Sequence, residues 1–156
     1  MTVAEDYLTL AHELDKALSL PRIKRVWLPP FRDNPDRSAE FGAVVLEDDS
    51  VGLMFVLLED TLRQINDRLH PATLAGADVV EIAQEFSSDD AARRALGLGA
   101  INAIGQHVIR VTGLPLDTAT NSFASFDPQP EDRIGMVGFF PPLVERMRDS
   151  NIALTV

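Results

Sequence analysis

A row of small residues inside a helix-forming segment constrains this fold more than any other feature of the sequence. The segment 87–113 has three interior glycines, Gly97, Gly99 and Gly105. Each interior glycine costs a helix about 1 kcal/mol relative to alanine. Close approach of another backbone to the helix is the simplest compensation, so we expect this helix at the centre of the domain, packed against a sheet. Ser87 or Ser88 is its expected N-cap, and Gly113 ends it.

Three apolar segments supply that sheet. The residues at 22–28, "RIKRVWL", alternate between polar and apolar and predict a half-buried strand. Two apolar runs follow at 41–47 and 51–58. The "EDDS" sequence that joins them has turn chemistry, because Asp and Ser side chains bond their own backbone. We therefore predict a three-stranded antiparallel meander.

Shorter helices surround the central one. Apolar residues recur at intervals of three and four over 3–18, which predicts an amphipathic helix. Thr2 and Glu5 have the spacing of a capping box at its start. The segment 59–70 opens with acidic residues, which suit a helix N-terminus. A further helix is predicted over 77–86.

The end of the chain predicts a second, smaller unit. Strands at 133–138 and 151–156 flank a helix at 141–149, and this βαβ order gives parallel strands with a right-handed crossover. The fold class is therefore α+β. The expected organisation is a domain at 1–113, a proline-rich linker at 114–132 and a rudimentary βαβ unit at 133–156.

Charge and composition exclude several classes of function. Fourteen Lys and Arg residues stand against 24 acids, which gives a net charge of −10 and makes nucleic acid an unexpected partner. The sequence contains no cysteine, which rules out a disulfide, a thiolate nucleophile and a Cys-based metal site. The longest apolar run is far below the roughly 20 residues that span a bilayer. We expect a cytoplasmic protein without membrane partners.

The sequence "GMVGFFPP" at 135–142 is a candidate ligand-binding turn. Gly138 ends the predicted strand, and Phe139, Phe140 and Pro141 lead into the helix. The turn lacks the G-x-G-x-x-G fingerprint of dinucleotide sites. Free N–H groups in the first helical turn could bind an anion, although two prolines reduce their number. The alternative is a plain junction between strand and helix.

Other polar residues give weaker signals. Asn102 lies among apolar residues on a helix predicted to be buried, and a buried amide must be hydrogen-bonded. It either ties the helix to a loop or contacts a ligand. His12, His70 and His107 lack a second histidine at metal-ligand spacing, so we interpret them as surface or capping residues. Glu81 and Glu85 could clamp a cation, although such pairs are more often a solvated helix face.

Two stretches resemble a known family. "ALGLGAINAI" at 95–104 and "RIGMVGFFPPLVERM" at 133–147 are similar to segments of the putative heavy-metal chelation family. In the second stretch Val137, Gly138 and the Phe140–Pro141 pair match a V-G-x-F-P pattern. The resemblance implies an N-terminal domain like that of enolase, then a Rossmann-like domain, with a ligand or metal site in the cleft between them. The chain looks truncated relative to that family.

These observations favour binding over catalysis. Our first hypothesis is a non-catalytic protein that binds a small ligand or a metal chelate, and a metal ion is the cofactor that the resemblance implies. The expected site residues are Asn102, Gly138, Phe139, Phe140 and Pro141. The alternative is an interaction module whose βαβ strands pair with another subunit in a homo-oligomer such as a homodimer. An enzyme is the least supported option, because the sequence contains no nucleophile elbow and no catalytic triad.

Overall fold

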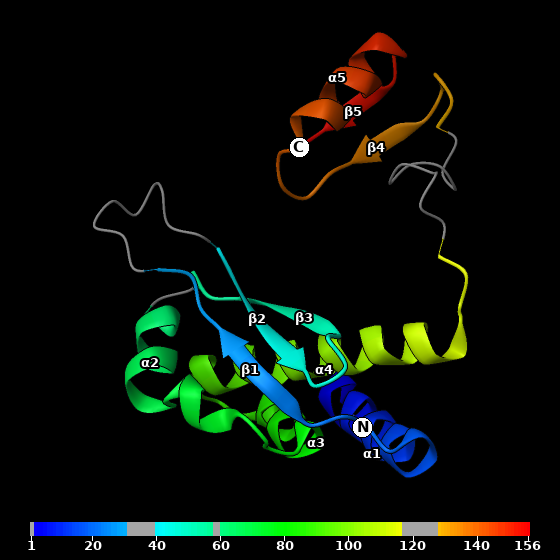
Figure 1. The fold of residues 1–156 in the computed structure, drawn as a ribbon. Helices are drawn as coiled ribbons and strands as arrows, with labels where there is room; N and C mark the ends of the chain where they lie inside the picture. Colours follow the sequence, from blue (N-terminus) through cyan, green and yellow to red (C-terminus); the bar gives the residue numbers. More distant parts are fainter. Residues whose placement is uncertain (1, 31–39, 58–59, 117–127) are drawn as a thin grey trace. The chain divides into compact units, whose positions relative to one another are not determined.

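The chain folds as two compact units, Met1–Leu114 and Pro115–Val156 (Figure 1). The computed structural model describes residues 2–30, 40–57, 60–116 and 128–156. Most of the predicted linker at 114–132 therefore lies outside the described residues. The described elements combine a three-stranded antiparallel sheet and helices with a small two-stranded parallel sheet, which confirms the α+β class.

Helix α1, Val3–Leu18, begins at the predicted capping box. The backbone N–H of Thr2 donates to Oε2 of Glu5 at 2.6 Å, and the N–H of Glu5 donates to Oγ1 of Thr2 at 3.3 Å. These two bonds satisfy N–H groups that have no partner within the helix. The helix ends at Leu18, and the next residue, Ser19, adopts a left-handed backbone while its N–H still donates to the carbonyl of Asp15.

The predicted meander is present. Strands β1, Ile23–Trp27, β2, Phe41–Leu46, and β3, Val51–Phe55, pair antiparallel in the order β1-β2-β3. The register is irregular between Ile23 and Arg25, where β1 has a bulge. β2 is the central strand, so β1 and β3 each leave one edge without a strand partner in the described sheet.

The helical elements after the sheet are mostly short. They are α2, Thr61–Arg68, η2, Pro71–Leu74, α3, Val79–Ala83, η3, Gln84–Ser87, and α4, Ala91–Thr112. The predicted N-cap of α4 at Ser87 or Ser88 is wrong. The chain is still in η3 at Ser87, and Oδ1 of Asp90 accepts the N–H groups of Ala92 and Arg93. Within the described ranges, no helix is both long enough and apolar enough to cross a bilayer.

Helix α4 packs directly on the sheet, as its glycines predict. A Cβ atom placed on Gly52 of β3 would lie 2.0 Å from the carbonyl oxygen of Gly99 and 2.2 Å from the backbone nitrogen of Ala103. A Cβ atom on Gly97 would lie 2.2 Å from the backbone nitrogen of Phe86. Gly105 differs, because a Cβ atom there would meet nothing within 4 Å. Close approach of neighbouring segments therefore explains why glycine occupies positions 97 and 99, but it does not explain Gly105.

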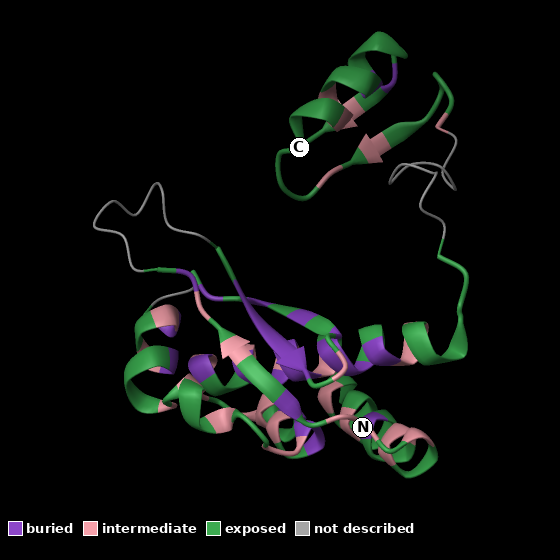
Figure 2. Cartoon of the chain, viewed as in Figure 1, coloured by how far each residue is buried: buried purple, intermediate pink, exposed green. Residues whose placement is uncertain are grey.

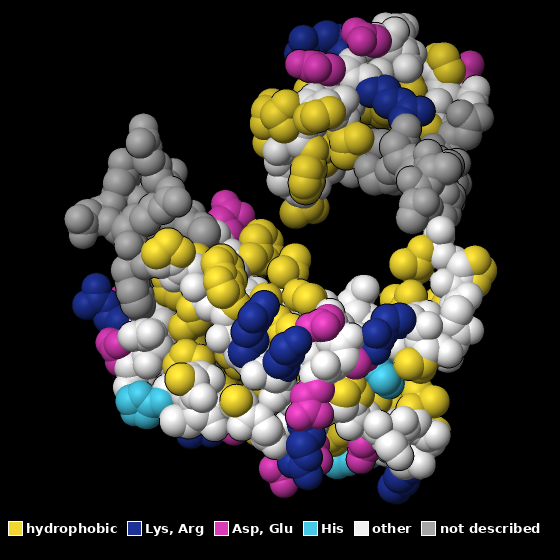
Figure 3. All heavy atoms as spheres, viewed as in Figure 1, with side chains coloured by type: hydrophobic (Ala, Val, Ile, Leu, Met, Phe, Trp, Pro, Cys, Tyr) yellow, Lys and Arg dark blue, Asp and Glu magenta, His cyan; other side chains and the backbone are white. Residues whose placement is uncertain are grey.

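The sheet has large apolar side chains on both faces. Its inner face contributes Val44, Leu46 and Met54 to the core beneath α4, and the buried residues follow β2 in Figure 2. Its outer face presents large side chains that are 36 to 54% exposed: Trp27, Phe41, Val51, Leu53 and Phe55. Figure 3 shows hydrophobic side chains gathered over these strands. An antiparallel sheet commonly has one apolar and one solvated face, so this outer face departs from the usual pattern.

The second unit is the predicted βαβ. Strands β4, Arg133–Gly135, and β5, Ala153–Thr155, pair in parallel, and α5, Pro141–Asp149, connects them. Both strands are shorter than predicted. Among the described residues of this unit, the buried apolar side chains are Met147 and Ile152.

Candidate functional site

The candidate turn presents apolar side chains to solvent. Val137, Phe139 and Phe140 are 99, 67 and 54% exposed. Gly138 has a φ angle of +90°, a conformation that side chains with a Cβ atom rarely adopt. The glycine and the proline that opens α5 therefore fix a turn whose two phenylalanine rings remain accessible.

The same turn offers few backbone donors. Pro141 and Pro142 have no N–H group, and the N–H of Leu143 donates to the carbonyl of Phe140 at 2.9 Å. The first turn of α5 thus lacks the free N–H groups that hold an anion at a helix start. Of the two interpretations, an anion cradle therefore has little support. Any ligand here would be recognised through the hydrophobic surface of the turn.

Asn102 ties α4 to the edge strand β3 of the sheet, not to a loop as predicted. Its Nδ2 atom donates to the carbonyl oxygen of Leu53 at 2.8 Å. The prediction that Asn102 is buried is wrong, because its side chain is exposed. The buried face of α4 runs through Gly99 and Ala103, and each helical residue turns about 100° from the last, so Asn102 points to the side. Its amide satisfies a carbonyl of the edge strand β3, and a role in ligand binding stays a prediction.

The predicted site residues fall in different units. Asn102 belongs to the first unit, whereas Gly138, Phe139, Phe140 and Pro141 belong to the second. Each group is described within its own unit. The expectation that one ligand contacts both groups therefore stays a prediction.

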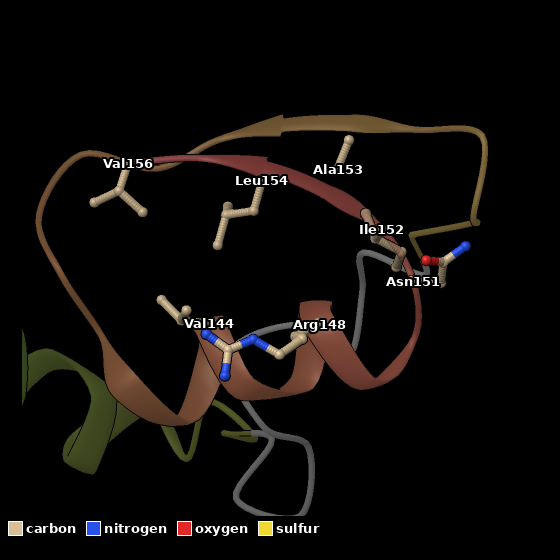
Figure 4. Close-up of a pocket in the computed structure, with 7 residues that line it drawn as sticks. All are labelled: Val144, Arg148, Asn151, Ile152, Ala153, Leu154 and Val156. Atoms are coloured by element: carbon tan, nitrogen blue, oxygen red, sulfur yellow. The ribbon is translucent and has the colours of Figure 1, made fainter.

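The second unit contains an open groove between α5 and β5 (Figure 4). Its volume is about 460 Å³, and its lining residues are Val144, Arg148, Asn151, Ile152, Ala153, Leu154 and Val156. Val144 and Leu154 point toward one another across the space, and the side chain of Arg148 lies beside them. The groove therefore combines apolar side chains with the guanidinium group of Arg148 and the amide of Asn151.

A partly buried contact between a histidine and an aspartate in the first unit escaped sequence analysis. Nδ1 of His107, on α4, lies 2.6 Å from Oδ2 of Asp48 in the turn between β2 and β3. Ser50 donates its N–H and its hydroxyl to the same carboxylate, both at 3.0 Å, and Arg110 donates to it as well. The prediction that His107 is a surface or capping residue is wrong, because it is 7% exposed.

The environment of Asp48 favours its charged form. Burial by itself raises the pKa of the carboxyl group, but the hydrogen bonds from His107 and Ser50 and the charge of Arg110 outweigh that effect. The net result is a pKa lowered from 3.8 to about 2. The spacing of Ala100, Ala103 and His107 along one helix face was the signal that could have indicated burial of His107.

The remaining candidate ligands do not converge. His70 is exposed at the start of η2, and Nε2 of His12 lies 3.5 Å from Nε2 of Gln84. The carboxylate of Glu85 accepts from Arg93 at 2.8 Å, so it does not form a free pair with Glu81. The contacts of His12 and Glu85 are between surface side chains of neighbouring helical elements.

Comparison with known proteins supports the resemblance found in the sequence. The family model described as "Putative heavy-metal chelation" matches residues 38–105. The resemblance to that family is confirmed over this stretch. The matched stretch runs from the residues before β2 through the first two thirds of α4. The matched residues contain β2, β3, the glycine contacts of α4 and Asn102, but neither β1 nor the turn at Gly138.

A solved structure has the same fold. The chain is similar to a protein with unknown function from the DUF364 family of Desulfitobacterium hafniense DCB-2, with a TM-score of 0.59 and 16% sequence identity. The match covers 98% of this chain and 57% of the other, so the chain spans little more than half the length of that protein. A search of curated proteins found no match.

The described donor groups do not fit a bare heavy-metal ion. Protein sites for such ions need three or four converging donors, commonly thiolates, imidazoles or carboxylates. The sequence has no cysteine, and no group of three or more His, Asp or Glu residues lies together in the described part of the chain.

Proposed function

We propose that this chain is a non-catalytic binding protein for a metal chelate or a comparable small ligand, and that the turn at Gly138–Pro141 contacts that ligand. The exposure of Phe139 and Phe140 on a turn fixed by glycine and proline is the observation that carries this proposal. Exposed aromatic rings on a defined backbone are a common recognition surface, since they bury large area at low cost in conformational entropy.

A chelate suits the chemistry better than a free ion. A chelated metal keeps its donors on the organic ligand, so the protein need only contact the hydrophobic and polar surface of the complex. The family description points to heavy-metal chelation, and the described residues lack a converging donor set. A ligand that brings its own chelating groups agrees with the family description and with the lack of a converging donor set.

Isothermal titration calorimetry tests this proposal. The probes are Zn²⁺ and Ni²⁺ alone and the same ions as citrate and phenanthroline complexes. We expect binding of a complex but not of the free ion, and a loss of at least about tenfold in affinity in the double variant F139A/F140A. The matched control is V111A/L114A, which removes two side chains that are 49 and 56% exposed in the first unit.

The control variant and the free ions distinguish two ways in which the proposal could fail. Equal affinity of F139A/F140A and V111A/L114A for a complex would place the site away from the turn and overturn this part of the proposal. Tight stoichiometric binding of free Zn²⁺ or Ni²⁺ would contradict the chelate and point to donors beyond the described residues.

The groove in the second unit favours a second candidate function, a subunit that pairs with another copy of this chain through β5. A strand edge beside a groove lined by Val144 and Leu154 is suited to addition of another strand. Two-stranded units with few buried side chains gain most from such completion. The expected assembly is a homodimer in which the two β5 strands run antiparallel across a two-fold axis.

Multi-angle light scattering distinguishes this candidate. We expect a dimer whose dissociation constant rises at least about tenfold in L154K, because the lysine would carry charge into the groove. T155K is the matched control, since Thr155 is the next residue along β5 and is exposed. A monomer at high protein concentration would contradict pairing through β5.

A further inference from the structure

A second cavity lies in the first unit, where the end of β3 meets α2, η3 and the start of α4. Its volume is about 250 Å³. The apolar side chains on its wall include Phe55, Phe86, Ala95 and Leu98, and its polar side chains are Thr61 and Arg94. A concave apolar site with a few polar groups is the usual form of a small-molecule site. All six residues belong to the first unit, so the cavity is defined without reference to the turn at Gly138.

Thr61 lacks a hydrogen-bond partner. It is 2% exposed, and within the described residues its Oγ1 atom has no donor or acceptor in reach. Buried hydroxyl groups are normally bonded, so each exception calls for an explanation. Oγ1 is covered by protein, but rotation about χ1 moves the hydroxyl relative to the cavity that the residue lines, and threonine in a helix populates two such rotamers. A ligand in the cavity would supply the missing partner.

Arg94 supplies a positive charge at the same cavity. Its Nη1 atom donates to the carbonyl oxygen of Ser88 at 2.9 Å, which anchors one side of the guanidinium group. No carboxylate of the described residues forms an ion pair with Arg94, in contrast to the neighbouring Arg93, which binds Glu85. An anchored guanidinium group with free donors is well suited to a carboxylate.

We propose that this cavity binds a small aromatic carboxylate. The ring of the ligand contacts the apolar wall at Phe55, Phe86 and Leu98, because flat rings pack well against phenylalanine. Its carboxylate accepts hydrogen bonds from Arg94 and from the hydroxyl of Thr61. The volume of about 250 Å³ suits a single ring with a short acidic substituent.

Titration of the ¹⁵N-labelled full chain with benzoate, followed by NMR, tests the proposal. We expect saturable shifts at the backbone amides near Phe55, Phe86 and Arg94. Benzamide, which has the same shape without the charge, should bind at least about tenfold more weakly, since it lacks the charge-assisted bond. The spectra also report whether each variant is folded.

Two variants test the assigned roles. R94Q should weaken benzoate binding by at least about tenfold, and R93Q, which makes the same change in charge one residue away, should leave it within about twofold. T61V, which keeps the shape of the side chain, should weaken binding by about two- to tenfold. Equal affinities of R94Q and R93Q, or no saturation with benzoate up to roughly 10 mM, would overturn the proposal. Neither result bears on the turn at Gly138, so this inference and the proposed function fail independently.

Discussion

Nδ1 of His107 lies 2.6 Å from Oδ2 of Asp48, although 59 residues separate the two in the sequence. The contact joins the second half of α4 to the turn between β2 and β3. It also gathers Ser50 and Arg110 around one carboxylate. A partly buried carboxylate that accepts several hydrogen bonds leaves its donors without a partner when it is removed.

Replacement of Asp48 by asparagine is therefore expected to destabilise the first unit. The D48N variant should lose about 1–3 kcal/mol in the free energy of unfolding, measured by urea denaturation, because His107 and Arg110 lose their charged acceptor. D49N is the matched control. Its carboxylate is exposed and pairs with Lys24, so its unfolding midpoint should stay close to that of the parent chain. Equal losses in the two variants would contradict a special role for Asp48.

The stability of the chain should depend on pH through the same residue. The pKa of Asp48 falls from 3.8 to about 2 in the folded state, so the folded state binds this proton more weakly than the unfolded chain does. The contribution is fully present above about pH 4 and is lost as the pH falls toward 2, with a size on the order of 1–2 kcal/mol. Urea midpoints of the parent chain and D48N, measured from pH 6 to pH 2, should converge at the acidic end. A constant difference would show that the carboxylate charge is unimportant.

The two glycines Gly52 and Gly105 should respond to alanine in opposite directions. In G52A the new methyl group would meet backbone atoms of α4 at 2.0 and 2.2 Å, so we expect a loss of more than about 3 kcal/mol or failure to fold. In G105A the methyl group meets nothing within 4 Å, and alanine is the better helix former by about 1 kcal/mol. Thermal unfolding monitored by circular dichroism should therefore show a higher midpoint for G105A. A lower midpoint would mean that Gly105 has a role beyond packing.

Thr61 to valine should not destabilise the free protein. The hydroxyl of Thr61 is buried and has no partner within the described residues, so its replacement by a methyl group removes an unpaired polar atom. We expect a gain of about 0–2 kcal/mol in the free energy of unfolding, measured in the absence of ligand. T61S is a useful comparison, because it keeps the hydroxyl and deletes a buried methyl group. A marked loss in T61V would indicate a hydrogen bond to this hydroxyl.

The sequence predicts the main elements because their signals are local. The stripe of apolar residues and the capping box fix α1, and two apolar runs around a turn fix the β2–β3 hairpin. The glycines of α4 also indicate a contact partner, because close packing must compensate for the helix stability that they cost. The prediction that this partner is the sheet is confirmed at Gly52 and Gly99.

Features that depend on the register between elements could not be predicted. The pair Asp48–His107 requires knowledge of which turn of α4 lies over the hairpin. The N-cap of α4 lies in a run of four suitable residues, "SSDD", and the length of η3 selects Asp90. Asn102 has apolar neighbours in sequence, yet its direction on the helix exposes it. The cavity lined by Thr61 and Arg94 joins four elements, so no short motif indicates it.

The small core of the second unit affects how its ligands will be measured. Met147 and Ile152 are the buried apolar side chains among its described residues. A ligand that contacts Phe139 and Phe140 on the turn held by Gly138 and Pro141 binds the folded form of this unit, so it stabilises that form by mass action. The unfolding midpoint of the unit should then rise with ligand concentration. For a unit with so few buried side chains among its described residues, ligand binding would be read as a gain in stability.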